Sequence, residues 1–315
     1  MNAEDQRFIR ALETADKALL QSVPRSDLHC HAGLSFRLEV LERWAGKKIT
    51  PPPSLMESLA PMNRWITEEL TELYQDRKCF EFSLKAALAE AWNDGITLLE
   101  MSIDVSFIGL YENDPMRFTR FIREAHQVVA PEVDFRPELG IARDADPGRW
   151  LPLMRDCIET GVFRSIDLYG TEDARPPEMY AEMYQHARSA GLKCKMHSGE
   201  FGTAASMEHD LNVLRPDAIQ HGIAAASSQE LMRRLADEGT VLNVCPTSNI
   251  RLSRVTGYRH HPIRTLFDAG IQVTLNSDDI MVFGSLVSDE YLHLFTRGVM
   301  NAEELNQIRI TGLSQ

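Results

Sequence analysis

The sequence has 315 residues, of which 43% are hydrophobic and 25% are charged, and its formal net charge is −13. These proportions are typical of a folded globular enzyme and exclude a disordered, collagen-like or coiled-coil chain. The acidic balance argues against nucleic-acid binding, because contacts to phosphates need clustered Lys and Arg side chains. We therefore expect a globular protein that acts on a small molecule.

The five cysteines are an odd number with no close pair, which fits a reducing compartment better than a disulfide framework. The first 24 residues carry charges throughout and lack the apolar segment of a signal peptide. No later stretch approaches the roughly 20 apolar residues that a membrane span requires. These features predict a cytoplasmic protein without a membrane partner, and they leave its oligomeric state open.

The chain begins with an amphipathic helical pattern over Asp5–Gln21 and then alternates short apolar runs with longer helical patterns. This alternation is typical of repeated βα units. Eight such runs favour an α/β fold of the (β/α)8 TIM-barrel type over an open sheet. The predicted strands are Ser26–His31, Ile96–Asp104, Asp134–Ala142, Val162–Leu168, Leu192–His197, Ala218–His221, Val241–Val244 and Gln272–Asn276.

The stretch between the first two predicted strands is too long for a simple connection. Residues 33–94 contain Pro51-Pro52-Pro53 and then helical patterns through Met56–Ala91. We predict a helical insertion after strand 1 that caps the barrel mouth, within a single domain of residues 1–315. Three apolar residues of the insertion have helical spacing, which fits either a lid over a ligand or, more often, ordinary core packing. They are Met62, Trp65 and Ile66.

Helix boundaries between the strands carry recognisable signals. Asp146-Pro147 and Pro176-Pro177 are typical of helix starts, whereas Ala190-Gly191 and Ala269-Gly270 are typical of helix ends. The last helical pattern begins at Ala302 and has no obvious C-terminal cap, so we expect a shortened or loosely packed end.

His29 and His31 are one residue apart on the first predicted strand, so their side chains project from the same face. Two such imidazoles can converge on one metal ion. Taken alone, such a pair is more often two partly buried, hydrogen-bonded histidines than a metal site.

Further polar residues lie at the ends of other predicted strands, and they strengthen the prediction of a metal site. His197 ends the fifth, His221 ends the sixth, and Asp278 and Asp279 follow the eighth. Active sites of TIM barrels are assembled at this carboxyl-terminal rim. The other histidines fall in helical patterns or precede Pro262, where surface or capping roles are expected; they are His126, His186, His209, His260, His261 and His293.

Imidazole nitrogens and a carboxylate oxygen are ligands that Zn2+ accepts, with one position left for water. His29, His31, His197 and Asp278 meet this requirement, so we predict one Zn2+ per chain, another divalent metal being an alternative. Such an ion lowers the pKa of water from 15.7 to roughly 7. Glu200, three residues beyond His197, is the predicted proton donor; a cap of the following helix is the competing interpretation.

The ordered set of motifs resembles the adenosine deaminase family of the amidohydrolase superfamily along nearly the whole chain. Five blocks carry this resemblance: Asp27-Leu28-His29-Cys30-His31, Ile166-Asp167-Leu168-Tyr169-Gly170, His197-Ser198-Gly199-Glu200, Gln220-His221-Gly222 with Cys245-Pro246-Thr247-Ser248-Asn249, and Asn276-Ser277-Asp278-Asp279.

The resemblance implies hydrolytic deamination, in which metal-bound hydroxide attacks C6 of a 6-aminopurine or its nucleoside and ammonia leaves. It implies that Glu200 protonates N1 of the purine ring. It implies that His221 orients or deprotonates the attacking water, that Asp279 bonds N7 and that the Gly170 backbone donates to N3. The expected partner is a small purine-like substrate.

Two positions depart from the family pattern. Ala32-Gly33-Leu34 follows the second histidine where nucleoside deaminases have Leu-Asp-Gly, so the aspartate expected to bond the ribose 5′-hydroxyl is absent. Gln220 stands where glycine is common and is expected to alter polar contacts around His221. Loss of a buried hydrogen-bond partner costs about 1–3 kcal/mol, which is enough to change substrate choice.

The same residues also fit two alternative functions. A mononuclear amidohydrolase that deaminates another aminated heterocycle or a 5′-substituted adenosine would use the same metal ligands and Glu200. A non-catalytic purine-binding protein is a different class, and it would have no need for both Glu200 and His221.

Overall fold

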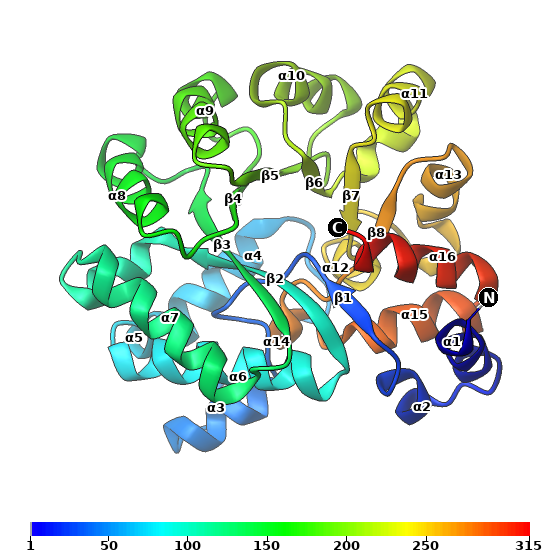
Figure 1. The fold of residues 1–315 in the computed structure, drawn as a ribbon, viewed down its shortest axis with the longest axis horizontal. Helices are drawn as coiled ribbons and strands as arrows, with labels where there is room; N and C mark the ends of the chain where they lie inside the picture. The colour runs from blue at the N-terminus through cyan, green and yellow to red at the C-terminus, as the bar shows by residue number, and fades with distance from the viewer. Residues whose placement is uncertain (1) are drawn as a thin grey trace.

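The computed structural model describes residues 2–315 and has at its centre a sheet of eight parallel strands in sequential order (Figure 1). The strands are β1 Arg25–Asp27, β2 Ile96–Asp104, β3 Asp134–Ala142, β4 Ser165–Tyr169, β5 Lys193–Ser198, β6 Ala218–His221, β7 Val241–Val244 and β8 Val273–Leu275. Each strand pairs in parallel with the next along the chain. The predicted (β/α)8 TIM barrel is therefore confirmed.

The predicted strands agree with the structure except at some ends, and the largest difference is in β1. Regular pairing stops at Asp27, so His29 and His31 lie beyond the strand. The amide of Leu28 bonds the side-chain oxygen of Asn276 instead of a neighbouring strand. Pairing with β2 resumes where Ser102 N donates to Cys30 O at 2.8 Å. The two histidines are thus held by bridges rather than by a continuous ladder.

The barrel closes between β8 and β1 at its carboxyl-terminal rim. Cys30 and Asp278 form an isolated parallel bridge, in which Asp278 N donates to His29 O at 2.9 Å. Because Asp278 has a φ of 56°, this bridge contains a backbone conformation that non-glycine residues rarely adopt. The seam of the barrel therefore runs through residues that the sequence predicts as metal ligands.

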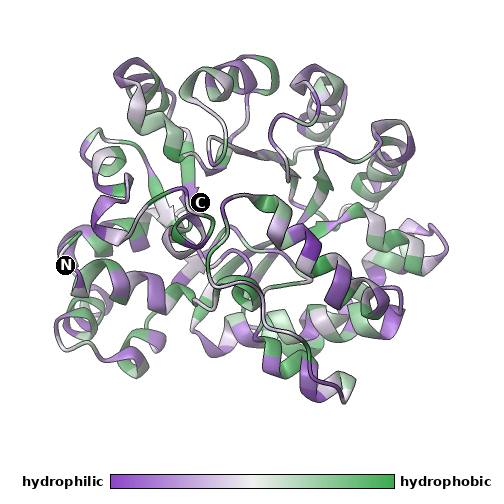
Figure 2. Cartoon of the chain, turned by 180° about the vertical axis from the view of Figure 1, so that it is seen from behind, coloured by the Kyte–Doolittle hydropathy of each residue, from purple (hydrophilic) through white to green (hydrophobic). Residues whose placement is uncertain are grey.

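Helices surround the strands and place their apolar faces against them. Figure 2 shows hydrophobic and hydrophilic residues side by side along each outer helix, as expected for helices with one buried face. These helices are α7 Pro115–Val129, α8 Pro147–Glu159, α9 Ala181–Ser189, α10 Ala204–Leu214, α11 Gln229–Glu238, α13 Ile263–Asp268, α15 Val287–Thr296 and α16 Ala302–Leu313. Shorter segments are η2 Val105–Tyr111, η3 Pro177–Tyr180, η4 Ile223–Ser227, α12 Pro246–Arg251, η5 Tyr258–His260 and α14 Ile280–Phe283.

The predicted helix boundaries are largely confirmed. Asp146 caps α8 by accepting from Gly148 N, and Pro177 opens a short 3-10 segment that leads into α9. Helices α9 and α13 end directly before Ala190-Gly191 and Ala269-Gly270.

The predicted N-terminal helix over Asp5–Gln21 is interrupted. Helix α1 covers Ala3–Glu13 and α2 covers Lys17–Gln21, with Ala15 between them at a φ of 49°. Asp16 ends the interruption by accepting from Leu19 N at 2.9 Å, which makes it the N-cap of α2. A capping side chain therefore divides one amphipathic pattern into two helices.

The expectation of a loosely packed C-terminal end is wrong. Helix α16 begins with a capping box of Asn301 and Glu304 and packs against β1 and β8. A Cβ at Gly312 would collide with the Ser26 side chain, so the close approach depends on glycine. The helix thereby covers the end of the barrel opposite to the Cys30–Asp278 bridge.

Residues 33–94 form the predicted helical segments between β1 and β2. They are α3 Leu38–Ala45, α4 Leu59–Trp65, η1 Ile66–Leu70, which is a π-helical turn, α5 Thr71–Tyr74 and α6 Arg77–Asn93. Trp65 is buried, and its indole N–H donates to Thr50 O at 2.6 Å. Trp65 therefore belongs to the core of the insertion, whereas Met62 and Ile66 line a cavity described below. No helix within residues 2–315 has the length and apolar character to cross a membrane.

The barrel interior below the rim contains two polar clusters. Lys195 on β5 forms ion pairs with Glu100 on β2 and Glu138 on β3, and all three side chains are buried. On the other side, Asn243 donates to Gln220 Oε1 and accepts from Thr274 Oγ1, both at 2.8 Å. These contacts link β2, β3 and β5 on one side and β6, β7 and β8 on the other.

Gln220 is buried, and its expected effect on polar contacts around His221 stays a prediction. Gln220 points into the barrel and bonds Asn243, whose backbone oxygen in turn lies 3.2 Å from Nδ1 of His29. Among the described residues, the hydrogen bonds of the Gln220 side chain go to Asn243 and to Leu28 O.

Candidate active site

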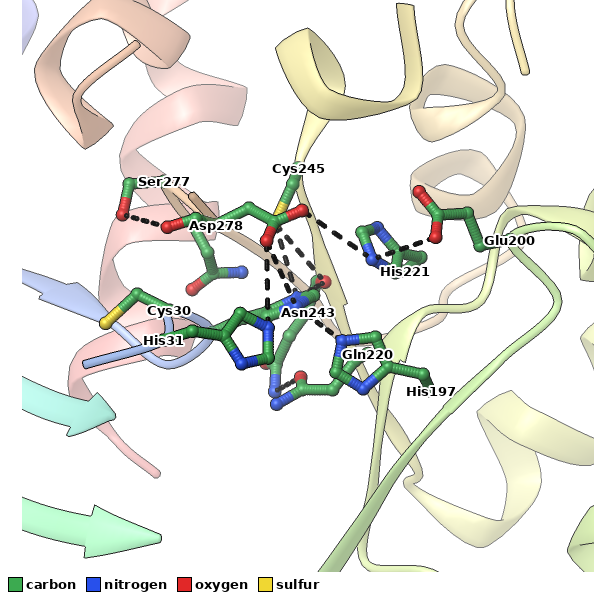
Figure 3. A network of polar contacts seen from close by, with 12 residues as sticks. Cys30, His31, His197, Glu200, Gln220, His221, Asn243, Cys245, Ser277 and Asp278 are labelled. Carbon is green, nitrogen blue, oxygen red and sulfur yellow. Dashed lines mark hydrogen bonds and ion pairs between the residues drawn. The ribbon is translucent and has the colours of Figure 1, made fainter. Parts of the chain in front are cut away.

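Three histidines and one aspartate converge at the barrel rim. Nε2 of His29 lies 3.0 Å from Nε2 of His197. Oδ1 of Asp278 lies 3.7 Å from Nε2 of His31 and 3.9 Å from Nε2 of His29. Figure 3 shows His31, His197 and Asp278 facing the same small volume. The four residues that the sequence predicts as metal ligands are therefore brought together from three places in the chain.

The spacing of these atoms suits a divalent ion. A tetrahedral zinc with bonds of roughly 2.0–2.1 Å separates its ligand atoms by about 3.3 Å. The observed separations of 3.0, 3.7 and 3.9 Å lie on either side of that value. His29, His31 and His197 also form one of the groups of side chains that could hold a metal ion within residues 2–315.

Hydrogen bonds determine which nitrogens face this volume. Nδ1 of His29 donates to Asn243 O and Nδ1 of His197 donates to Asp167 Oδ1, each at 3.2 Å. With both Nδ1 atoms protonated, the two Nε2 lone pairs point at one another across 3.0 Å. A cation between them removes this repulsion, so the donor set fits a metal. An acceptor on the second ring nitrogen is also the usual support of a metal-bound histidine.

Burial keeps His29 and His31 in their neutral forms. Burial lowers the pKa of His31 to about 4, and burial followed by the neighbouring histidines lowers the pKa of His29 well below its usual value. Burial also acts to lower the pKa of His197, yet the Asp167 carboxylate raises it overall. Neutral imidazole is the form that binds a metal.

Glu200 is held beside this group by an unusual loop. The Glu172 carboxylate accepts four backbone N–H groups of the loop that carries Glu200, at 2.7 to 3.3 Å; the donors are Gly199, Glu200, Phe201 and Gly202. Gly199 has a φ of +73°, and a Cβ there would approach Met207 Sδ to 2.8 Å. The sharp turn expected from His197-Ser198-Gly199-Glu200 is therefore present and is fixed by one carboxylate.

The environment of Glu200 favours its protonated form. Its side chain is buried, and burial, followed by the charge of Asp278, raises the pKa of Glu200 well above its usual value. Asn249 Nδ2 donates to Glu200 Oε1 at 3.1 Å. A carboxylic acid that stays neutral near pH 7 can act as a proton donor.

His221 lies between Glu200 and Asp278. Its Nε2 is 3.5 Å from Glu200 Oε2 and 3.8 Å from Asp278 Oδ2 (Figure 3). Its Nδ1 lies 3.2 Å from Asn249 Nδ2, which can only donate. Nδ1 is therefore unprotonated in the neutral ring, and Nε2–H points toward the site.

A further histidine fixes the orientation of Asn249. Nε2 of His261 lies 3.1 Å from Asn249 Oδ1, and Ile263 N donates to Nδ1 of His261 at the start of α13. The expected capping role of His261 is thus present, but its expected surface position is wrong because the side chain is buried. Its imidazole is part of a hydrogen-bonded chain that ends at His221.

Two residues of the candidate active site have strained backbone conformations. His221 and Asp278 have φ values of 63° and 56°, in the left-handed region that disfavours residues with a Cβ. Such conformations cost of order 1–3 kcal/mol each and are enriched at functional sites. At both positions the chain turns sharply after a strand, and the turn directs the side chain toward the rim.

A cavity of about 700 Å³ opens over this site. His31, His197, Glu200, His221 and Asp278 form part of its wall. Gly170 and Asp279, the predicted substrate contacts, also line the cavity. Asp279 is buried, and its Oδ1 has no hydrogen-bond partner among the described residues. Burial and the charge of Asp278 raise the pKa of Asp279 well above its usual range.

Sequence reasoning assigned no role to three residues that support the site. Asp167 orients His197, Glu172 fixes the loop of Glu200, and Asn249 contacts Glu200 and His221. For Asp167 a signal was present, because a charged residue within an apolar strand is rarely buried without a partner. Asn249 belongs to one of the motif blocks that carry the family resemblance, although no role was assigned to it, and Glu172 lies in a loop, where sequence pattern carries no comparable information.

Comparison with known proteins agrees with these observations. Residues 151–315 match the family model described as adenosine deaminase. Adenosine deaminase of Clostridium acetobutylicum is 35% identical over 95% of this chain and 94% of its own length.

Solved structures share the fold. Adenine deaminase from Arthrobacter aurescens superposes with a TM-score of 0.81 at 22% identity, covering 92% of this chain and 93% of that one. A zinc-containing amidohydrolase from Burkhoderia ambifaria superposes with a TM-score of 0.79 at 20% identity, covering all of this chain and 88% of that one. The chain belongs to the adenosine deaminase family of the amidohydrolase superfamily and is a hydrolase that deaminates an adenine-type substrate.

Proposed function

We propose that the protein is a zinc-dependent deaminase that removes the 6-amino group of an aminopurine or its nucleoside as ammonia. The observation that carries this proposal is the convergence of His29, His31, His197 and Asp278 beside Glu200 and His221 in one cavity. A metal site and an acid–base pair in contact are what hydrolytic deamination requires.

The proposed metal ligands are the Nε2 atoms of the three histidines and a carboxylate oxygen of Asp278. The facing lone pairs of His29 and His197 support this assignment, as does the zinc ion in the amidohydrolase from Burkhoderia ambifaria. One zinc per chain is proposed, since the ligand atoms enclose a single small volume. When bound, the ion supplies Lewis-acid activation of water.

The remaining residues act on the purine ring and on protons. Water adds its oxygen to C6, and the bond from C6 to the exocyclic nitrogen breaks. One proton of the water goes to that nitrogen, which leaves as ammonia, and the other replaces the proton that Glu200 gives to the ring. Glu200 gives its proton to ring N1, which makes C6 more electrophilic. The Nε2–H of His221 orients the attacking oxygen and stabilises its developing charge.

The ring itself is held from two further sides. Asp279 bonds N7 through the oxygen that has no partner within the protein. The backbone N–H of Gly170 donates to N3. Residues 33–94 cap the barrel mouth, because Leu59, Met62 and Ile66 of this segment contribute to the cavity wall. Such a cover excludes water from the reacting ring.

The experiment that tests the proposal combines metal analysis with ammonia release. Protein loaded with zinc is expected to hold about one ion per chain and to release ammonia from adenine-type compounds. Asp278→Ala is expected to lose metal and turnover together, whereas Glu200→Gln keeps the metal and loses turnover. Full activity of Glu200→Gln, or the absence of a bound ion after supplementation, would contradict the proposal.

A further inference from the structure

The cavity is larger and more apolar than a free purine base requires. Its volume of about 700 Å³ falls within the range of roughly 300–1,000 Å³ that holds drug-sized ligands. Beyond the rim, its wall is formed by side chains of the insertion, of η2 and of α8. The principal apolar residues are Leu59, Met62, Ile66, Phe107, Leu110 and Trp150.

The charges around the cavity have one sign. Among the described residues that line it, none is Lys or Arg, and the carboxyl groups are those of Asp104, Glu200, Asp278 and Asp279. Asp104 already accepts from Ser106 N at 2.7 Å and from the Tyr169 hydroxyl at 2.5 Å. A phosphate group in the cavity would lose its hydration without gaining a cationic partner, which is strongly unfavourable.

Position 33 offers space but no hydrogen-bond acceptor from a side chain. A Cβ placed on Gly33 would meet Phe107 Cζ and the ring of Tyr74 only at 3.8 Å, an ordinary contact distance. The Tyr74 hydroxyl donates to Gly33 O and lies 3.1 Å from Ser83 Oγ. The wall two residues beyond His31 is therefore apolar, with its nearest hydroxyl already engaged.

We propose that the preferred substrate is an adenine nucleoside whose 5′ position carries an uncharged, apolar substituent in place of a hydroxyl or phosphate. This inference rests on the proposed function, because the purine must sit at Glu200 for its substituent to reach the outer cavity. The 5′ substituent packs against Phe107 and Leu110, and the absence of Lys and Arg from the wall rejects nucleotides.

A substrate series tests the inference on the zinc-loaded enzyme. The compounds are adenine, adenosine, 5′-deoxyadenosine, 5′-methylthioadenosine, 5′-phenylthio-5′-deoxyadenosine and AMP, with ammonia release as the readout. The value of kcat/KM for 5′-methylthioadenosine is expected to exceed that for adenosine by about tenfold or more, as for added apolar groups in a fitted pocket. AMP is expected to be poorer than adenosine by roughly a hundredfold.

Binding of the deaminated products gives a readout that does not depend on turnover. Calorimetry with 5′-methylthioinosine, inosine and IMP is expected to give the lowest Kd for the thioether. Its heat-capacity change of binding is expected to be the most negative, which is the mark of apolar burial.

Two pairs of variants test which residues of the cavity wall determine the preference for the 5′ substituent. Leu110→Lys is expected to lower kcat/KM for 5′-methylthioadenosine about tenfold and to raise that for AMP, because it adds a cation to the wall. Leu55→Lys is the matched control, since Leu55 is exposed and does not line the cavity. Gly33→Asp is expected to shift the preference toward adenosine, whereas Gly33→Ala adds only the Cβ and leaves the ranking unchanged.

The outcomes separate this inference from the proposed function. Release of ammonia from none of the compounds would overturn the deaminase proposal itself. Turnover that is fastest with adenine, adenosine or AMP would leave deamination standing and overturn the inference about the 5′ substituent. A ranking led by the 5′-thioethers and altered by Leu110→Lys but not by Leu55→Lys would support both.

Discussion

The side-chain amide of Asn249 lies 3.2 Å from Nδ1 of His221, and this contact sets which ring nitrogen carries the proton. Because Asn249 Oδ1 accepts from His261, its amide nitrogen must face the active site. His221 is thereby held with Nε2–H directed toward Glu200 and Asp278. The contact thus selects one of the two tautomers and fixes an N–H donor at the place where the proposed mechanism puts the attacking water.

Asn249→Asp is expected to reverse this tautomer, because a carboxylate accepts a hydrogen bond from a protonated Nδ1 and so leaves Nε2 of the neutral ring unprotonated. We expect kcat to fall by about 10²-fold or more, as it does when a catalytic histidine is held in the wrong tautomer. Steady-state kinetics with zinc analysis of the same sample checks this. Asn212→Asp, on the exposed side of α10, is the control. Normal kcat in Asn249→Asp would contradict the assigned proton position.

Glu172→Gln tests whether the four N–H contacts to this side chain hold Glu200 in place. An amide cannot accept from all four donors, and hydrogen bonds to a charged group are worth about 1.5–3 kcal/mol each. We expect kcat to fall at least tenfold while zinc content stays at its wild-type value. The exposed Glu182→Gln serves as control. Equal loss of metal and activity would mean that Glu172 supports the metal ligands instead.

Asp167→Ala is expected to weaken metal binding, because Asp167 accepts the Nδ1–H of His197. Removal of such a partner typically lowers metal affinity by about 10–100-fold. Competition with a zinc chelator measures this affinity directly. Asp173→Ala, at an exposed position, should not change it. An unchanged affinity in Asp167→Ala would show that His197 is oriented without this carboxylate.

Lys195→Met is expected to destabilise the barrel by about 3–5 kcal/mol, because it leaves Glu138 buried without a cation and Glu100 with only Arg136, at 3.6 Å. Urea denaturation measures the free energy of unfolding. Adding Glu100→Gln and Glu138→Gln to the variant should recover part of the loss. Lys48→Met, whose side chain is 91% exposed in the native protein, should change little. A small effect of Lys195→Met alone would contradict the ion-pair assignment.

The raised pKa of Glu290 predicts that the stability of the protein depends on pH. Burial raises its pKa to about 7 from an ordinary 4.5, although Thr247 N donates to its carboxylate at 3.2 Å. The folded protein therefore binds more protons than the unfolded chain between these values, so stability falls as pH rises through this window. The contribution amounts to about 3 kcal/mol.

Glu290→Gln removes this titration, so its free energy of unfolding should decline less between pH 4.5 and 7 than that of the wild-type protein. Exposed Glu303→Gln is the control for a general charge effect. Parallel pH profiles of wild type and Glu290→Gln would contradict the raised pKa.

Much of the fold could be predicted because βα units leave a strong local pattern. The strands β2 and β3 match their predicted ranges, because each is a short segment between two longer helical patterns. Predictions failed where a single contact from elsewhere in the chain decided the structure. Regular β1 pairing stops at Asp27, and the side chain of Asn276 takes the next amide proton.

The sequence alone determined the barrel, the order of its strands, and the chemical identity of His29, His31, His197, Glu200 and Asp278. Strand ends in a parallel barrel share one rim, so position along the chain already implies proximity. Only the tertiary structure decided the proton positions of the histidines and the orientation of Glu200. These depend on Asp167, Glu172 and Asn249, whose contacts join residues far apart in sequence. The apolar, cation-free cavity likewise arises only when the insertion, η2 and α8 meet in space.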